Sequence, residues 1–312
     1  MDVLLAVAGF GVGTIVGLTG MGGGALMTPI LVLAFGVPPL AAVSSDLAAS
    51  AVMKPFGGIV HARNGSVNWG LVRWLCAGSV PSAFAGVLLL RLLGDQGTVQ
   101  QIIQYALAGA LLLAAAGLVA RGYINRWRGG PGGGGPGGEE PADGAVPPIR
   151  VRPLPTALLG AAGGLVVGLT SVGSGSLIIV VLLALYPRLR PSHLVGTDIV
   201  QAIPLVLAAA LGHAFFGDLH LDLAGAVLVG SIPGVLLGSR LSARAPAAVV
   251  RAALVIVLTA SALKLLKVPT VATLAMAGAL LLVAVGAGLR TARRARATQA
   301  QEVRDMSGSL AN

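Results

Sequence analysis

The chain of 312 residues is 55% hydrophobic and only 10% charged, with a formal net charge of +10. A soluble domain carries about a quarter charged residues, so this chain lacks the charged surface that water requires. We therefore expect the lipid bilayer to surround most of it. The basic residues lie between and after apolar runs, as loop charges of membrane proteins do, which argues against a nucleic-acid partner.

Cysteine usage and the first residues add two expectations. The single cysteine, Cys76, lies in an apolar run and is most simply a small buried hydrophobe. One cysteine forms no internal disulfide and no cysteine-type zinc site, and we expect neither a metal nor a cofactor. The segment 1–3 lacks the basic region of a cleaved signal peptide, so the first apolar run is expected to be retained.

Apolar runs of helical length follow one another along the whole chain. A bilayer core of about 30 Å needs roughly 20 helical residues. The runs lie near 3–36, 42–61, 70–90, 99–122, 156–186, 194–216, 222–239, 248–266 and 270–289. The first and fifth are too long for one crossing, and glycine clusters at 20–24 and 173–175 should break them. The sequence predicts an all-α, polytopic membrane helix bundle in which these two runs are each a pair of short helices.

Composition divides the chain into regions. Residues 128–153 are rich in glycine and proline with nothing to bury, and are predicted to be a flexible linker. The linker separates a first transmembrane repeat, 1–127, from a second, 154–268. Residues 269–290 are predicted to add an extra transmembrane helix. The basic, polar tail 291–312 is expected to be disordered or to lie at the membrane surface.

The two halves repeat each other with an offset of 151 to 152 residues. Corresponding segments are Gly17-Leu18-Thr19-Gly20 with Gly168-Leu169-Thr170-Ser171, Ser45-Asp46 with Thr197-Asp198, His61 with His213, and Gly78-Ser79-Val80-Pro81 with Gly230-Ser231-Ile232-Pro233. Duplicated halves with glycine-interrupted segments at matching positions are typical of secondary transporters. In such proteins the breaks indicate the substrate site.

Loop charges indicate the relative orientation of the halves. If each long run enters the membrane and returns as a re-entrant hairpin, the halves are inverted. Most arginine-containing loops, including those at Arg63, Arg188 and Arg240, then share one side with the linker and tail. That side is expected to be cytoplasmic. If the long runs cross once, the repeats are parallel and the charges sort less well, so we favour the inverted arrangement.

At this point the residues resemble a known family. The carrying motifs are the glycine-broken first run, Ser44-Ser45-Asp46 with Gly196-Thr197-Asp198, the segment from His61 to Trp69, and the two Gly-Ser-x-Pro motifs. Their order is similar to that of the TauE/SafE sulfite exporter family, also called the four-toluene-sulfonate uptake permeases. The resemblance implies a multi-pass inner-membrane permease for a small anionic substrate: sulfite, an organosulfonate or a related acid. Ser174 opposite Gly23 and Val180 opposite Pro29 depart from the first-half pattern.

Ionisable residues within lipid are costly and usually functional. Asp46 and Asp198 are candidates for proton coupling or gating, although each could instead be a helix N-cap. Lys54, two helical turns after Asp46, is a candidate anion partner, although it could also snorkel to the interface. Gln201 could face the pathway. His61 and His213 are coupling or gating candidates, with an interfacial polar role as the alternative.

The glycine clusters are candidate substrate-binding elements. They comprise Gly22, Gly23 and Gly24 in the first half and Gly173, Ser174 and Gly175 in the second. Unpaired N–H groups at the starts of half-helices attract anions, but small residues could equally serve close helix packing. Candidate hydroxyl donors are Thr19, Thr28, Thr170, Ser171, Ser174 and Ser176.

Other classes of function fit less well. An intramembrane serine protease needs a nucleophile paired with a base, and no histidine is clearly paired with Ser174. No His-Glu-x-x-His motif is present, so a zinc protease is unsupported. A non-transporting assembly or sensory subunit would not need charged residues in its apolar runs. The sequence therefore predicts a permease, with secondary, proton-coupled transport favoured and a channel left open.

Overall fold

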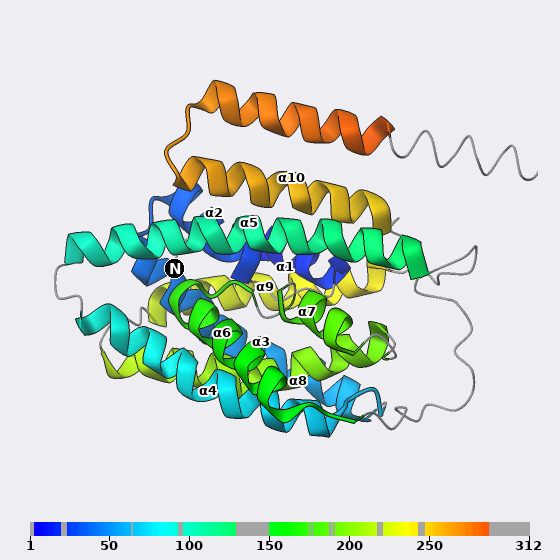
Figure 1. The fold of residues 1–312 in the computed structure, drawn as a ribbon. Helices are drawn as coiled ribbons and strands as arrows, with labels where there is room; N and C mark the ends of the chain where they lie inside the picture. The colour runs from blue at the N-terminus through cyan, green and yellow to red at the C-terminus, as the bar shows by residue number, and fades with distance from the viewer. Residues whose placement is uncertain are drawn as a thin grey trace, which may run out of the picture.

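The computed structural model describes residues 3–19, 24–63, 65–92, 96–128, 150–173, 175, 177–186, 189, 191–216, 221–242 and 247–286. Over these residues the regular structure is helical (Figure 1), as predicted. The first half contains α1 (Val3–Thr19), α2 (Gly24–Phe35), α3 (Pro39–Arg63), α4 (Trp69–Leu92) and α5 (Gln96–Arg128). The second contains α6 (Pro153–Thr170), α7 (Leu177–Leu185), α8 (Pro191–Phe215), α9 (Leu221–Ser242) and α10 (Ala247–Leu265).

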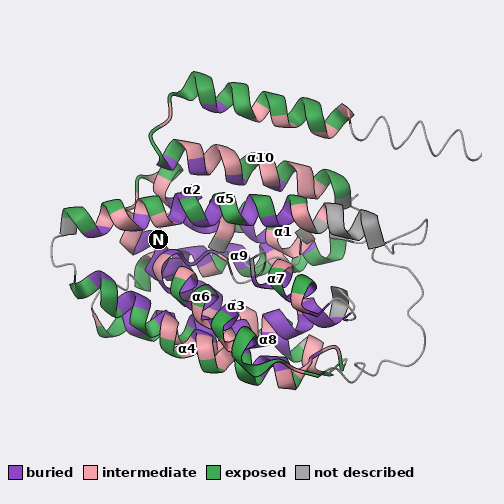
Figure 2. Ribbon diagram, in the orientation of Figure 1, coloured by how far each residue is buried: buried purple, intermediate pink, exposed green. Residues whose placement is uncertain are grey.

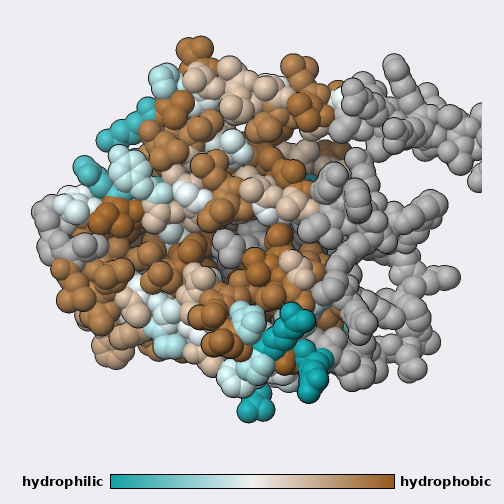
Figure 3. Space-filling view, viewed as in Figure 1, coloured by the Kyte–Doolittle hydropathy of each residue, from teal (hydrophilic) through white to brown (hydrophobic). Residues whose placement is uncertain are grey.

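Six helices of the described chain are long and apolar enough to cross a bilayer, namely α4, α5, α6, α8, α9 and α10. The face shown in Figure 3 is largely hydrophobic, and its hydrophilic groups lie mainly toward the ends of the helices. Exposed apolar side chains over the middle of such a bundle are what lipid requires. The protein is therefore a multi-pass membrane protein. The predicted linker lies outside the described residues between 129 and 149.

Each of the two over-long apolar runs forms two helices, as predicted. In the first run, α1 ends at Thr19 and α2 begins at Gly24. In the second, α6 ends where Ser171 adopts a left-handed conformation (φ 59°), and its N–H donates to the carbonyl of Val167. Such a left-handed cap satisfies a terminal carbonyl and reverses the chain.

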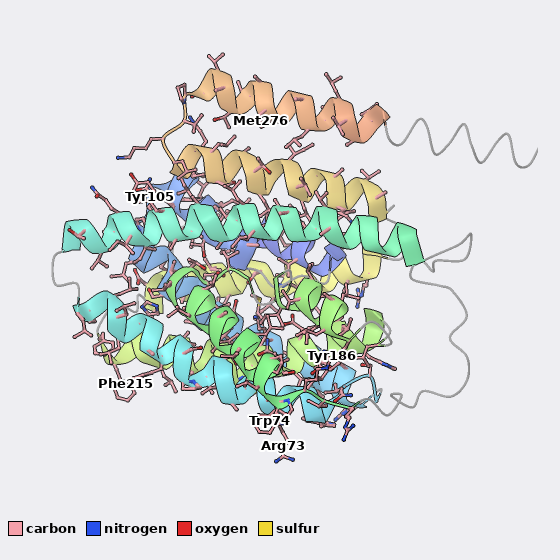
Figure 4. The ribbon with its side chains drawn as sticks, viewed as in Figure 1. Arg73, Trp74, Tyr105, Tyr186, Phe215 and Met276 are labelled. Atoms are coloured by element: carbon pink, nitrogen blue, oxygen red, sulfur yellow. The ribbon has the colours of Figure 1, made fainter. Side chains whose placement is uncertain are left out.

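The two short helices of the second run form a hairpin. The hydroxyl of Tyr186, just after α7, accepts a hydrogen bond of 2.9 Å from the N–H of Arg152, just before α6. The same hydroxyl lies 2.6 Å from that of Thr156 in the first turn of α6. Tyr186 is labelled in Figure 4. The end of α7 therefore lies beside the start of α6, so the chain returns to the side from which it entered.

The first helix of each half packs against the fourth helix of the other half: α1 on α9, and α6 on α4. Glycines line both contacts. A Cβ added to Gly230 would lie 1.8 Å from the carbonyl oxygen of Ala6, and one added to Gly78 would lie 1.9 Å from that of Ala157. Small residues let helix backbones approach closely, and this packing joins the two halves into one bundle.

Helices that correspond under the sequence repeat run antiparallel to each other. In the α3–α8 pair, Gly58 lies next to Val200 and Ile203, while Gly196 near the start of α8 lies next to His61 near the end of α3. In the α5–α10 pair, Gln104 near the start of α5 donates a 2.6 Å hydrogen bond to the last residue of α10. Opposite directions of equivalent helices are what an inverted repeat predicts.

The long helices place the loops at two opposite edges of the bundle (Figure 1). The edge at which α3, α5 and α9 begin is called the first edge. The edge at which α4, α6, α8 and α10 begin is called the second edge. At the first edge the N–H of Leu40 donates to Gln100 Oε1 at 3.1 Å. At the second edge the N–H of Asn68 donates to Thr197 Oγ1 at 3.0 Å. Arg63, Arg150, Arg152 and Arg240 all lie at the second edge.

The hydrophobic core surrounds the crossing of α3 and α8. One cluster joins Leu47 of α3 to Leu205 of α8 and Ile103 of α5. A larger cluster joins α2, α5 and α10 through residues such as Leu31, Leu111 and Leu258. Polar side chains are buried on the facing parts of α3 and α8: Ser44, Ser45, Asp46, Ser50, Thr197, Asp198 and Gln201. The centre of the bundle is therefore polar along these two helices.

A further helix, Thr270–Gly286, follows α10. Figure 2 shows that most of this helix is exposed. Val271 is 80% exposed and Leu282 is 74% exposed, whereas Thr273 is buried. The helix therefore contributes little to the core of the described structure. It lies within residues 269–290, where the sequence predicts an extra transmembrane helix, but it is shorter than the six helices that are long enough to cross a bilayer. The tail after residue 286 lies outside the described residues.

Candidate functional site

Asp46 joins three helices at the centre of the bundle. It lies in the interior of α3 and is only 1% exposed. Its Oδ2 accepts hydrogen bonds from Thr28 Oγ1 of α2 at 3.0 Å and from Ser171 Oγ, just after α6, at 2.5 Å. A single carboxylate oxygen therefore connects the first half of the chain to the break in the second half.

The other oxygen of this carboxyl group, Oδ1, is buried and has no hydrogen-bond partner among the described residues. Leaving a buried polar atom unsatisfied costs about 1–3 kcal/mol, and more for a charged group. A buried carboxyl group with one open oxygen is poised to bind a proton or a ligand, which makes Asp46 a functional candidate.

The alternative that Asp46 and Asp198 are helix N-caps is wrong. The two helices begin at Pro39 and Pro191, so each aspartate lies about two turns inside its helix. The sequence suggested caps because the serines and threonine beside the aspartates are good capping residues just ahead of apolar runs. The helices instead begin earlier, at prolines, which suit the first turn of a helix.

Asp198 belongs to a second polar network. It is 3% exposed, and its Oδ1 accepts a 3.1 Å hydrogen bond from Nε2 of Gln201, one turn later on α8. The amide oxygen of Gln201 in turn accepts from Ser79 Oγ of α4 at 3.4 Å. Gln201 is fully buried and therefore bridges α8 and α4. Ser79 was not among our predicted site residues, although the repeated Gly-Ser-x-Pro motif signalled its position.

Lys54 provides the positive charge of this region. It lies in the middle of α3, is partly accessible, and its ammonium interacts electrostatically with both Asp46 and Asp198. Lys54 therefore interacts electrostatically with both of the other charged residues predicted from the apolar runs. The arrangement is asymmetric between the two halves. The second-half residue equivalent to Lys54 is Val206, and the first-half residue equivalent to Gln201 is Ala49.

The two histidines lie near opposite edges, at the ends of α3 and α8. His61 is half-buried, with its Nδ1 3.0 Å from Ser66 Oγ. His213 is fully buried, with its Nε2 3.2 Å from the carbonyl oxygen of Gly168.

The predicted glycine-rich elements are only partly described. Gly22, Gly23 and Ser174 lie outside the described residues, as do Gly20 and Ser176. Gly24 is the first residue of α2, and Gly173 has a φ of 120°, a conformation that favours glycine. Gly175 lies in the turn between α6 and α7.

Among the predicted hydroxyl donors, Thr28 and Ser171 bind Asp46. Thr170 Oγ1 instead donates to the carbonyl of Val166 in its own helix, at 2.6 Å. Within the described part of the chain, no three His, Cys, Asp or Glu residues are grouped as metal ligands. The chemistry that the described site offers is therefore proton binding by carboxyl groups and charge pairing by one ammonium group.

A helical bundle in lipid that buries ionisable side chains in its interior has the construction of a membrane transporter. The chain belongs to the sulfite exporter TauE/SafE family, whose family description matches residues 5–265. It is 38% identical over 251 residues to the probable membrane transporter protein YjnA of Bacillus subtilis (strain 168), covering 78% of this chain and 91% of that protein.

A second relative is more distant. The probable membrane transporter protein YdhB of the same organism is 25% identical over 255 residues, which covers 80% of this chain and 94% of that protein. No solved structure gives a significant match. The family match ends at the last residue of α10, so the exposed helix Thr270–Gly286 lies beyond the matched region.

Proposed function

We propose that this protein is a secondary transporter that moves small sulfur-containing anions, such as sulfite or organosulfonates, across the inner membrane of the cell together with protons. The observation that carries the proposal is the pair of buried carboxyl groups, Asp46 and Asp198, both of which interact electrostatically with Lys54. The family's description as sulfite exporters supports the class of substrate.

Charge balance connects anion binding to protons. With all three side chains ionised, two carboxylates and one ammonium group carry one net negative charge. Adding a monovalent anion would bring a second uncompensated negative charge into a region of low dielectric, which is strongly unfavourable. A proton on each carboxyl group makes the anion-loaded site neutral, so anion entry is expected to accompany proton uptake.

Lys54 is the proposed anion partner. Its ammonium group is a compact point charge with three donors, which suits the oxygens of a sulfite or sulfonate group. Lys54 is partly accessible, in contrast to the two buried aspartates. Protonation of the carboxyl groups would release Lys54 from its present partners and make it available to the substrate.

The proposed transport cycle uses the two halves as inverted repeats, each beginning with a re-entrant hairpin. The antiparallel pairing of α3 with α8 and of α5 with α10 supports this arrangement. In inverted-repeat transporters, one bundle rocks against the other around a site at the repeat interface. The hydrogen bond from Ser171 to Asp46 crosses that interface and would be remade during the cycle.

The decisive experiment uses purified protein in liposomes with labelled sulfite and several small organosulfonates, under imposed pH gradients. We expect uptake that exceeds that of empty liposomes and that a proton gradient accelerates. Movement of another class of solute, with no flux of any such anion, would contradict the substrate assignment. An anion flux whose rate does not change with the pH gradient would contradict the proposed proton coupling.

A further inference from the structure

We propose that Asp46 and Asp198 exchange protons with opposite sides of the membrane, and that Lys54 is the counter-ion they share. This inference rests on the proposed proton coupling and deepens it, because it assigns one carboxyl group to each side. It also accounts for a carboxylate pair in which each member has its own hydrogen-bond network.

The two carboxyl groups lie toward opposite edges of the bundle. Each lies seven residues from the first residue of its helix, Pro39 in α3 and Pro191 in α8. At about 1.5 Å per residue, each is about 10 Å from the edge at which its helix begins. Because α3 and α8 are antiparallel and begin at opposite edges, Asp46 lies toward the first edge and Asp198 toward the second.

Different polar groups surround each of the two carboxyl groups. Asp46 is bonded to Ser171, and one turn earlier on α6 the carbonyl of Gly168 faces His213 at the first-edge end of α8. Asp198 follows Thr197, whose hydroxyl accepts from the N–H of Asn68 at the second edge. Each carboxyl group is thus tied to polar groups at the nearer edge.

Lys54 provides a positive charge for both carboxyl groups. It lies close to the α3–α8 crossing, and its ammonium group interacts with both carboxyl groups. The other titratable groups near them are His213 from α8 and His61 from α3, His193 one turn before Thr197 on α8, and Cys76 of α4, whose thiol contacts the carbonyl of Gln201.

The charges explain how the two sides would communicate. One ammonium group neutralises one carboxylate, so the low-dielectric centre is neutral when the other carboxyl group carries a proton. A proton that reaches Asp46 from the first edge would neutralise this carboxylate, and the ammonium group of Lys54 would then pair with Asp198. A proton that reaches Asp198 would have the opposite effect, so that the ammonium group would pair with Asp46. The carboxylate that pairs with Lys54 would therefore depend on which side of the membrane supplied the proton.

The transport test uses substrate counterflow in membrane vesicles of defined sidedness, with the pH set separately on each side. We expect Asp46→Asn to lose the dependence on pH at the first-edge side and keep it at the second, and Asp198→Asn to show the reverse. The matched control is Asp222→Asn, an exposed carboxylate at the first edge, which should keep both dependences. Loss of dependence on the same side in both aspartate variants would overturn the proposal.

A labelling test decides the question without relying on flux. In a Cys76→Ala background, Asp46→Cys and Asp198→Cys are treated from each side with a membrane-impermeant thiol reagent, after size-exclusion chromatography confirms folded protein. We expect position 46 to react from the first-edge side and position 198 from the second. Reaction of both from one side, or of neither, would overturn the inference, whereas absent sulfite flux with the expected labelling would contradict only the proposed substrate.

Discussion

Ser171 combines a costly backbone conformation with a functional contact. Its left-handed φ of 59° costs a non-glycine residue roughly 1–2 kcal/mol, yet its hydroxyl donates to a carboxylate that is buried with one open oxygen. Strained residues of this kind cluster at functional sites. The residue is therefore better explained by its contact with Asp46 than by the stability of the turn.

Replacing this residue separates the two roles. Ser171→Gly keeps the left-handed conformation without strain but removes the hydroxyl, whose bond to a charged group contributes about 1.5–3 kcal/mol. We expect a melting temperature close to that of the parent protein and a clear loss of proton-driven anion uptake. Retention of full uptake would show that the hydroxyl is dispensable, and Thr170→Ala on the preceding residue serves as the control.

The charge of Lys54 should be required for substrate binding. Lys54→Met keeps the length of the side chain and removes the ammonium group, so an anion would lose its partner while two carboxyl groups remain. We expect KM for the transported anion to rise at least about tenfold, the effect of about 1.4 kcal/mol. The measurement is initial uptake against substrate concentration. An unchanged KM would exclude Lys54 as the anion partner, and Lys267→Met, at an exposed turn, is the control.

At the scale of helices, the close α1–α9 contact should depend on its glycines. In Gly230→Ala the new Cβ would fall 1.8 Å from the carbonyl oxygen of Ala6, so the two helices must move apart. Overpacking of this kind costs about 1–3 kcal/mol. We expect a lower thermal unfolding temperature in detergent.

Gly225 of the same helix is a matched control, because a Cβ there meets nothing within 4 Å. Since alanine favours a helix over glycine, Gly225→Ala should keep or slightly raise the unfolding temperature. Equal losses in both variants would mean that the α1–α9 contact is not the cause of the effect at Gly230.

For the whole molecule, the second edge should face the cytoplasm. Arginines gather there, and positively charged loops remain on the cytoplasmic side of a membrane. In a Cys76→Ala background, Arg91→Cys at the first edge should react with an impermeant thiol reagent in intact cells, whereas Arg63→Cys at the second edge should react only after permeabilisation. Both side chains are exposed, so the opposite pattern would reverse the assigned topology.

The exposed C-terminal helix should be dispensable for the core. Deleting residues 269–312 removes Thr270–Gly286, which lies beyond the family match and buries few of its described side chains. We expect the shortened protein to purify as a single species and to retain uptake in liposomes. Aggregation or loss of uptake would show that this helix supports the bundle in the membrane.

The class of protein and much of its helical organisation could be predicted from the sequence, because a lipid environment constrains which residues a helix can expose. A chain with few charged residues and with apolar runs of helical length requires lipid around most of its surface. Glycine clusters within the over-long runs indicate where the helices break. The same scarcity of charge drew attention to Asp46, Lys54 and Asp198, because an ionisable residue stands out in an apolar run.

The tertiary structure decided how these residues meet. The hydrogen bonds of Asp46 to Ser171 and of Gln201 to Ser79 join residues more than a hundred positions apart, and no local pattern encodes such contacts. Periodicity reports which residues face a neighbour, but the crossing of α3 and α8 determines which neighbour that is. Sequence alone thus predicted a duplicated helical membrane protein with few charges in its apolar runs, and only packing between the halves joined Asp46 to Ser171 and Gln201 to Ser79.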